Sequence, residues 1–161
     1  MISIRPARPE DVGLICAFIR ELADYERLSH EAQATEADLA AALFARHPKV
    51  FCDLAEWSGK PAGFALWFYT FSTFKGRHGI YLEDLYVRPE HRGSGIGRAL
   101  LTNLAWRCAD EGLGRLEWAV LDWNAPSIAF YERLGARPMN DWTVYRLTGD
   151  ALADLTRKGQ T

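Results

Sequence analysis

The sequence predicts an α/β protein in which a central mixed β-sheet is flanked by helices on both faces. Strand-patterned and helix-patterned runs alternate along the chain, one strand is apolar almost throughout, and a glycine-rich turn joins a strand to a helix past the middle. The chain has 161 residues, of which 48% are hydrophobic, and no repeat or linker interrupts it. This length and composition suit one core, so we predict a single domain over residues 1–161.

The first elements expected are one strand and two helices. Alternating side chains predict a strand over residues 2–5, and an apolar stripe at helical spacing predicts a helix over residues 10–27. Thr35 and Asp38 have the spacing of a capping box, although Asp takes the place of the usual Glu. A second helix is therefore expected over residues 35–46.

Three strands are expected next. β-rich runs predict strands over residues 50–57 and 62–71, joined by a turn at residues 58–61 that contains Gly and Pro. The second of these strands is the apolar one, which is typical of a strand covered on both faces. A third β-rich run, over residues 80–87, leads into the glycine-rich turn.

The last part of the chain continues the alternation. A helix is expected over residues 98–111 and a strand over residues 116–121. Asn124 is a good helix cap, and Gly135 can stop that helix in a left-handed conformation. We expect a closing strand over residues 144–147, followed by a short polar tail.

Composition argues against several classes of partner. The net charge is -2 and there is no basic block, so nucleic acid is not an expected partner. No apolar run reaches the roughly 18 residues of a membrane span, and the amino terminus does not resemble a signal peptide.

Cys16, Cys52 and Cys108 lie in apolar patterns and suggest buried thiols in a reducing cytoplasm. The four histidines are dispersed, so no metal site is expected.

The segment Arg92 to Gly97, with the pattern R-x-x-G-x-G, predicts a phosphate-binding turn. Glycine lets a backbone turn tightly and present its N–H groups, and the amino end of a helix favours an anion. A Walker loop would need Lys followed by Ser or Thr, where this chain has Arg98-Ala99, and the spacing also departs from the Rossmann pattern. A purely structural glycine turn is the alternative.

Two adjacent carboxylates interrupt the strand that leads into this turn. Strand alternation places Glu83 on one face with Tyr81, and Asp84 on the other face with Leu82 and Tyr86. A carboxyl group in apolar surroundings has a raised pKa, which suits a general base. We favour Glu83 for that role and expect Asp84 to form a structural ion pair with an arginine.

A second polar group lies on the helix that follows Asn124. Asn124, Ser127 and Tyr131 are spaced i, i+3 and i+7, which places them on one helix face. Taken alone, this stripe fits an ordinary amphipathic boundary. Its combination with the glycine turn and the carboxylates indicates a functional site.

Together these motifs resemble the two main motifs of the GNAT N-acetyltransferases. Further segments are similar to the diamine acetyltransferases, which include spermidine/spermine N-acetyltransferase and its thialysine-acetylating relatives. Those segments are Arg5-Pro6-Ala7, Glu21 to Glu26, Phe68 to Phe71 and Tyr81 to Asp84. The resemblance covers nearly the whole chain and implies the acyl-CoA N-acyltransferase fold, N-acetyltransferase activity and a homodimer.

The resemblance also implies a role for each matching residue. Glu83 would take the proton of the attacking amine and Tyr131 would protonate the departing thiolate, while Tyr25 and Glu26 would line the amine pocket. Attack would be direct, in a ternary complex, with no metal. Acetyl-CoA would be held by Leu85, Tyr86, Val87, Arg92, Gly93, Ser94, Gly95, Ile96, Gly97, Arg98, Asn124 and Ser127.

The segment Phe71 to Gly79 bears on which amine is accepted. It has Ser72 where the polyamine enzymes carry an acidic residue, and Lys75 and Arg77 add positive charge that would repel a long polycation. We therefore expect a thialysine-like amino acid or small diamine as acceptor, unless the segment is merely exposed. A protein or peptide N-acetyltransferase and a non-catalytic acetyl-CoA-binding module are the alternative functions.

Overall fold

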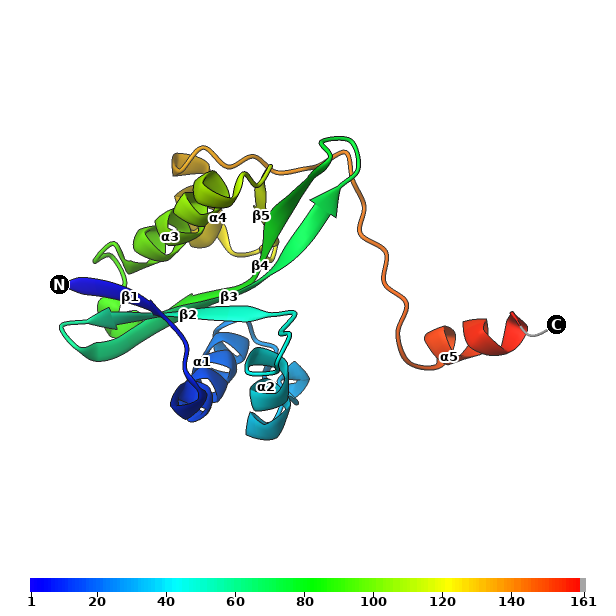
Figure 1. Ribbon diagram of the computed structural model, residues 1–161, viewed down its shortest axis with the longest axis horizontal. Helices are drawn as coiled ribbons and strands as arrows, with labels where there is room; N and C mark the ends of the chain where they lie inside the picture. The colour runs from blue at the N-terminus through cyan, green and yellow to red at the C-terminus, as the bar shows by residue number, and fades with distance from the viewer. Residues whose placement is uncertain (160–161) are drawn as a thin grey trace. The chain divides into compact units, whose positions relative to one another are not determined.

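The computed structural model describes residues 1–159 (Figure 1). These residues belong to two compact units, Met1–Leu121 and Asp122–Thr161. The first unit contains the β-sheet and helices α1 to α3, and the second contains helices α4 and α5. A single domain over the whole chain stays a prediction.

The β-sheet of the first unit is mixed, as the sequence predicts. Its strands follow the chain in the order β1-β2-β3-β4-β5, with antiparallel pairs from β1 to β4 and a parallel pair between β4 and β5. Within residues 1–159 the strands are β1 (Ile2–Pro6), β2 (Phe51–Trp57), β3 (Lys60–Ser72), β4 (Arg77–Val87) and β5 (Leu116–Trp118). Ser58 and Gly59 both have positive φ, which is the geometry of a two-residue hairpin turn between β2 and β3.

Helices cover both faces of this sheet (Figure 1). Helices α1 (Val12–Tyr25) and α2 (Glu36–Leu43) lie on one face, and α3 (Ile96–Glu111) lies on the other. The predicted capping box of α2 is confirmed, because the Asp38 amide donates to Thr35 Oγ1 at 3.1 Å and the Thr35 amide donates to Asp38 Oδ2 at 2.9 Å. Short 3₁₀ turns occupy Pro9–Asp11, Ser29–Glu31 and Pro89–His91.

Each face of the sheet has its own apolar core. On the side of α1 and α2, Phe18 stacks on Phe64 with ring centroids 5.5 Å apart, and both side chains are fully buried. On the side of α3, the helix buries Ile96, Leu100 and Leu104 completely. The apolar character of β3 therefore has the expected cause, since both of its faces are covered.

A β-bulge at Glu83 changes the predicted distribution of side chains along β4. Leu66 of β3 is opposite Asp84, but the next residue, Trp67, is opposite Leu82, so Glu83 is the extra residue. Cross-strand partners share a face, and neighbours along a strand alternate. Asp84 therefore lies on the face of Leu66, and Leu82 on the opposite face with Trp67. The prediction that Leu82 and Asp84 share a face is wrong because the inserted residue interrupts the alternation.

Strands β4 and β5 diverge soon after they pair. β5 is shorter than the predicted 116–121, and its register with β4 covers only Ile80 to Leu82. In the described part of the chain, the edge of β4 that faces away from β3 has no strand partner from Glu83 to Val87. The main-chain groups on that edge are therefore available to another binding partner.

The second unit differs most from the prediction. Helix α4 (Ala125–Arg133) begins after Asn124, and Gly135 has φ of 90°, both as expected. Residues 144–147 form no strand, because they pair with no neighbouring strand in the described residues. The expected polar tail is instead a helix, α5 (Gly149–Lys158), with Asp150 in its first turn and Arg157 and Lys158 in its last, as the helix dipole favours.

Gly63 sets the approach of β3 to the end of β4. A Cβ atom at this position would lie 2.4 Å from the Tyr86 carbonyl oxygen, which belongs to the backbone and cannot rotate away. We expect Gly63→Ala to lower the free energy of unfolding by about 1–3 kcal/mol, measured by urea denaturation. Gly114→Ala is the matched control, since its Cβ would lie closest to the flexible Lys75 side chain, at 3.3 Å, with only ordinary van der Waals contacts beyond it, and we expect a change within about 0.5 kcal/mol. Equal stabilities of the two variants would contradict this account.

Candidate active site

The glycine-rich turn forms the junction between β4 and α3. Gly93 and Gly95 have φ of 79° and 91°, and their Cβ positions are uncrowded, so backbone conformation rather than space requires glycine there. The first i to i−4 bond of α3 runs from the Ala99 amide to the Gly95 carbonyl at 2.9 Å. The amides of Ile96 and Gly97 lie ahead of this bond, at the positive end of the helix. The predicted strand–turn–helix geometry is confirmed, whereas phosphate binding stays a prediction.

Arg92 connects the start of this turn to helix α1. Its Nε donates to the Val87 carbonyl at 2.9 Å, and its guanidinium carbon lies 4.8 Å from the centroid of the Tyr25 ring and 5.7 Å from that of Tyr86. The structure thus brings together four of the predicted site residues. Tyr25, which is predicted to line the amine pocket, therefore lies beside the beginning of the turn that is predicted to hold the cofactor.

A cluster of carboxylates lies close to this junction. Asp84 is partly buried, and burial, with the nearby charges of Glu83 and Glu26, raises the pKa of its carboxyl group to about 7. Burial also raises the pKa of Glu26, the residue that follows α1. Glu83, the bulge residue, is exposed. Three acidic side chains, one just after α1 and two on β4, therefore share one region, and one of them can exchange a proton near neutral pH.

The ion pair expected for Asp84 does not form within residues 1–159. The two arginines that follow β4 in sequence are engaged elsewhere: Arg88 binds Glu21 through two hydrogen bonds of 2.9 and 3.2 Å, and Arg92 lies over Tyr25. Sequence reasoning favoured Glu83 as the base and did not assign a raised pKa to Asp84. The signal was present in the adjacent carboxylates of an otherwise apolar strand.

Three of the predicted site residues, Asn124, Ser127 and Tyr131, lie in the second unit. Asn124 caps α4, because its Oδ1 accepts a hydrogen bond from the Ser127 amide at 3.3 Å. Tyr131 lies two turns further along the same helix. The cap gives Asn124 a structural role, and the contacts predicted for Asn124, Ser127 and Tyr131 with the substrates stay predictions.

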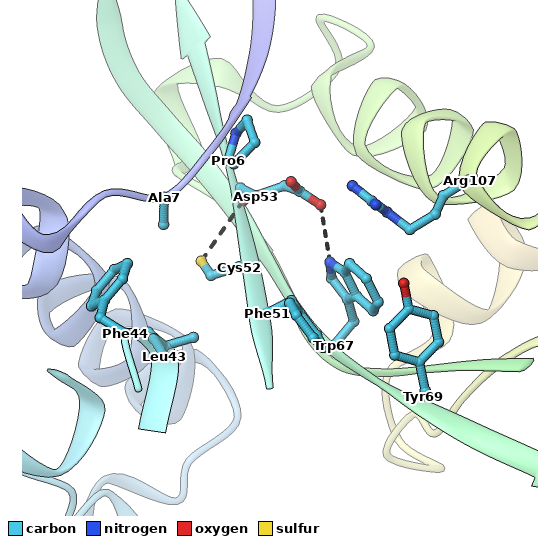
Figure 2. Close-up of a pocket in the computed structure, with 10 residues that line it drawn as sticks. All are labelled: Pro6, Ala7, Leu43, Phe44, Phe51, Cys52, Asp53, Trp67, Tyr69 and Arg107. Carbon is cyan, nitrogen blue, oxygen red and sulfur yellow. Dashed lines mark hydrogen bonds between the residues drawn. The ribbon is translucent and has the colours of Figure 1, made fainter. Parts of the chain in front are cut away.

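Sequence reasoning missed a cavity of about 190 Å³ in the first unit (Figure 2). Asp53 is only 3% exposed, and its Oδ2 accepts a hydrogen bond from Trp67 Nε1 at 3.0 Å. The Arg107 guanidinium lies over the Trp67 ring, 4.9 Å from its centroid. The lining residues are Pro6, Ala7, Leu43, Phe44, Phe51, Cys52, Asp53, Trp67, Tyr69 and Arg107. None of them belongs to the predicted active site.

The buried carboxylate in this cavity should make stability depend on pH. Burial raises the pKa of Asp53, although Trp67 and Arg107 oppose the shift. The folded state therefore binds the proton more tightly than the unfolded state, so this contribution to stability is complete below pH 3.8 and is lost as pH rises. We expect Asp53→Asn to melt about 2–4 °C above the wild type at pH 8 and at the same temperature near pH 4.

Asp11 supplies a comparison of opposite sign. Hydrogen bonds from Arg5, at 2.7 and 3.0 Å, lower the pKa of the Asp11 carboxyl group. Its contribution to stability is present above pH 3.8, so Asp11→Asn should lower the melting temperature at pH 8. Both measurements use thermal denaturation followed by circular dichroism. A lower melting temperature for both variants at pH 8 would contradict the account of Asp53.

The cysteines, the metal-ligating side chains and the helices were each expected to have particular properties. Cys16 and Cys52 are buried free thiols, as expected, and Cys108 is half-buried. Within residues 1–159, no group of three His, Cys, Asp or Glu side chains is arranged to hold a metal ion. Within the same range, every helix is too short or too polar to span a membrane.

Comparison with known proteins places the chain in a family. The Acetyltransferase (GNAT) family matches residues 16–136. Thialysine N-epsilon-acetyltransferase of Bos taurus is 39% identical to the chain over 168 residues, which cover 98% of each protein. L-ornithine N5-acetyltransferase of Arabidopsis thaliana is 34% identical, over 96% of this chain and 87% of its own length.

A solved structure shows the same fold. An integron cassette protein from the mobile metagenome of V. cholerae superposes with a TM-score of 0.80 at 29% identity, over 97% of this chain and 98% of that one. The predicted resemblance to the thialysine-acetylating branch is confirmed. The chain belongs to the GNAT acetyltransferase family and is an N-acetyltransferase.

Proposed function

We propose that this protein transfers an acetyl group from acetyl-CoA to the primary amine of a small molecule. The observation that carries the proposal is the carboxylate cluster of Glu26, Glu83 and Asp84. Glu83 and Asp84 lie on the strand that runs into the glycine turn, and Glu26 follows the helix that Arg92 contacts from that turn. An ammonium group would be attracted to this cluster, within reach of an acyl donor seated at the turn.

The cluster supplies a route for the amine proton. An alkylammonium has no free lone pair, so it must lose a proton before it attacks the thioester carbonyl. Asp84 has a pKa of about 7 and can accept that proton at neutral pH, either directly or through Glu83. The new C–N bond forms and the C–S bond breaks; Tyr131 would protonate the thiolate, and the second proton lost by the nitrogen would restore the Tyr131 phenol. Both substrates are present together in this scheme, with no acetyl-enzyme.

The acceptor we favour is a thialysine-like amino acid or a small diamine. The bovine and Arabidopsis relatives are named for thialysine and L-ornithine, which each carry a primary amine on an amino acid. In this chain the tip between β3 and β4 carries Lys75 and Arg77, and Phe74 there is almost fully exposed. Positive charge at that tip favours a compact acceptor over a long polycation.

We also infer a homodimer in the cytoplasm. The second unit leaves large apolar side chains in water, with Val144 90% and Tyr145 91% exposed. Such side chains are typical of a surface that a partner covers. Free thiols at Cys16 and Cys52 agree with a reducing compartment.

The test of the activity is release of the CoA thiol from acetyl-CoA, followed with a thiol reagent. The acceptors are thialysine, lysine, ornithine, diaminopropane, putrescine and spermidine. We expect turnover with thialysine or another small amine and weaker turnover with spermidine. A preference for spermidine would overturn the acceptor class, and no release with any amine would overturn small-molecule acetylation itself. Peptide acceptors would then be tested.

A further inference from the structure

The segment between β4 and α3 contacts α1 through two arginine side chains. Arg88 forms its two hydrogen bonds with Glu21, and Arg92 lies over the Tyr25 ring. Glu21 and Tyr25 are four residues apart, so they lie one turn apart on the same face of α1. The segment that contains the glycine turn therefore contacts two successive turns of the helix that ends beside the carboxylate cluster.

Arg92 contacts protein groups other than carboxylates. None of the ion pairs formed by residues 1–159 involves it, and its Nε is bound to the Val87 carbonyl. The guanidinium carbon lies 4.8 Å from the centroid of the Tyr25 ring and 5.7 Å from that of the Tyr86 ring, and a cation is attracted to such ring faces. Its contacts therefore reach towards the acceptor side as well as the cofactor side.

Tyr25 is the last residue of α1, and Glu26 follows it at the carboxyl end of the helix. Helix ends are held by fewer backbone bonds than helix interiors and open more readily. The contact with Arg92 restricts Tyr25, and with it the backbone that carries Glu26. A ligand that fixes the glycine turn would fix Arg92 and would remove part of the entropy cost of ordering this helix end.

We propose that Arg92 is a positioning residue that couples the two substrate sites. Binding of CoA or acetyl-CoA at the glycine turn holds Arg92 against Tyr25, so the amine binds more tightly to the protein that already holds the cofactor. Coupling of this kind is reciprocal, so the amine must strengthen CoA binding by the same factor. The inference rests on the proposed function, because it takes the turn as the CoA site and Tyr25 as part of the amine site.

The experiment measures the Kd of CoA by calorimetry, with and without a saturating amine chosen from the thiol-release assay. CoA is the product, so no turnover occurs. For the wild type we expect the amine to lower this Kd by about two- to fivefold, the range of an exposed cation–π contact. For Arg92→Met we expect a ratio of about one. Arg20→Met is the matched control on α1, because Arg20 is exposed, and it should keep the wild-type ratio.

Arg92→Lys gives a second variant that keeps the charge but loses the Nε bond and the flat stacking surface. It should show an intermediate ratio at an unchanged melting temperature. A wild-type ratio of one, or an Arg92→Met protein that binds CoA more weakly at an unchanged ratio, would overturn the coupling. Either result would leave acetyl transfer intact. Absence of CoA binding and of thiol release would instead defeat the proposed function, and this inference with it.

Discussion

Replacing Asp84 with asparagine is expected to lower the turnover of a small amine at pH 7 by about 10²-fold, the effect of removing a positioned proton acceptor. The wild-type rate should rise with pH through about 7, where burial and the charges of Glu83 and Glu26 place the pKa of Asp84. The pH profile of Asp84→Asn should lack this rise, which we call the rising limb of the profile. The measurement is a pH profile of kcat from thiol release, with the amine and acetyl-CoA saturating.

Glu83→Gln is the informative companion to this variant. Removing the Glu83 charge should lower the pKa of Asp84, so the limb should move to lower pH. If Glu83 is itself the proton acceptor, as the sequence suggests, Glu83→Gln will instead remove the limb and Asp84→Asn will retain it. The two profiles therefore assign the proton to one carboxylate.

Asp84→Asn should also be more stable than the wild type in alkaline solution. A raised pKa means that folded Asp84 holds its proton more tightly than the unfolded chain does. Its contribution to stability is therefore complete below pH 3.8 and is lost as pH rises to about 7. Asp84→Asn should gain about 1–3 kcal/mol over the wild type at pH 8 and nothing at pH 4, after allowance for partial exposure. Equal stability at both values would show that the carboxylate is not destabilised by folding.

Tyr131→Phe is expected to lower kcat at least about tenfold and to leave the Kd of CoA unchanged. The substitution removes the phenol proposed to protonate the thiolate and preserves the ring. Tyr145→Phe is the matched control in the same unit, since it also removes one phenol hydroxyl and keeps the ring, and it should keep full activity. Undiminished turnover of Tyr131→Phe would remove this residue from the mechanism.

Periodicity predicted most elements of the first unit because each has an apolar face that the sheet or a helix covers. It could not find the bulge, since one extra residue at Glu83 leaves no trace in a short pattern. It misjudged residues 144–147 because a strand-like sequence forms a strand only where a neighbour supplies hydrogen bonds.

Some features of the candidate site could be predicted from the sequence and others could not. The glycine turn has a local sequence signature, so its geometry could be foreseen. The contact between Arg92 and Tyr25 joins residues distant in sequence, and no local pattern reports it. The near-neutral pKa of Asp84 likewise depends on burial and on Glu26, which reaches β4 only in the folded chain.

The early divergence of β4 and β5 leaves a stretch of sheet edge without a neighbour. An open edge invites pairing with other chains, so it is a hazard during storage and at high concentration. A ligand that hydrogen-bonds along Glu83 to Val87 would occupy the same groups as an intruding strand. Substrate recognition and protection from aggregation would then depend on one feature, and the ligand-free enzyme would be the form most prone to self-association.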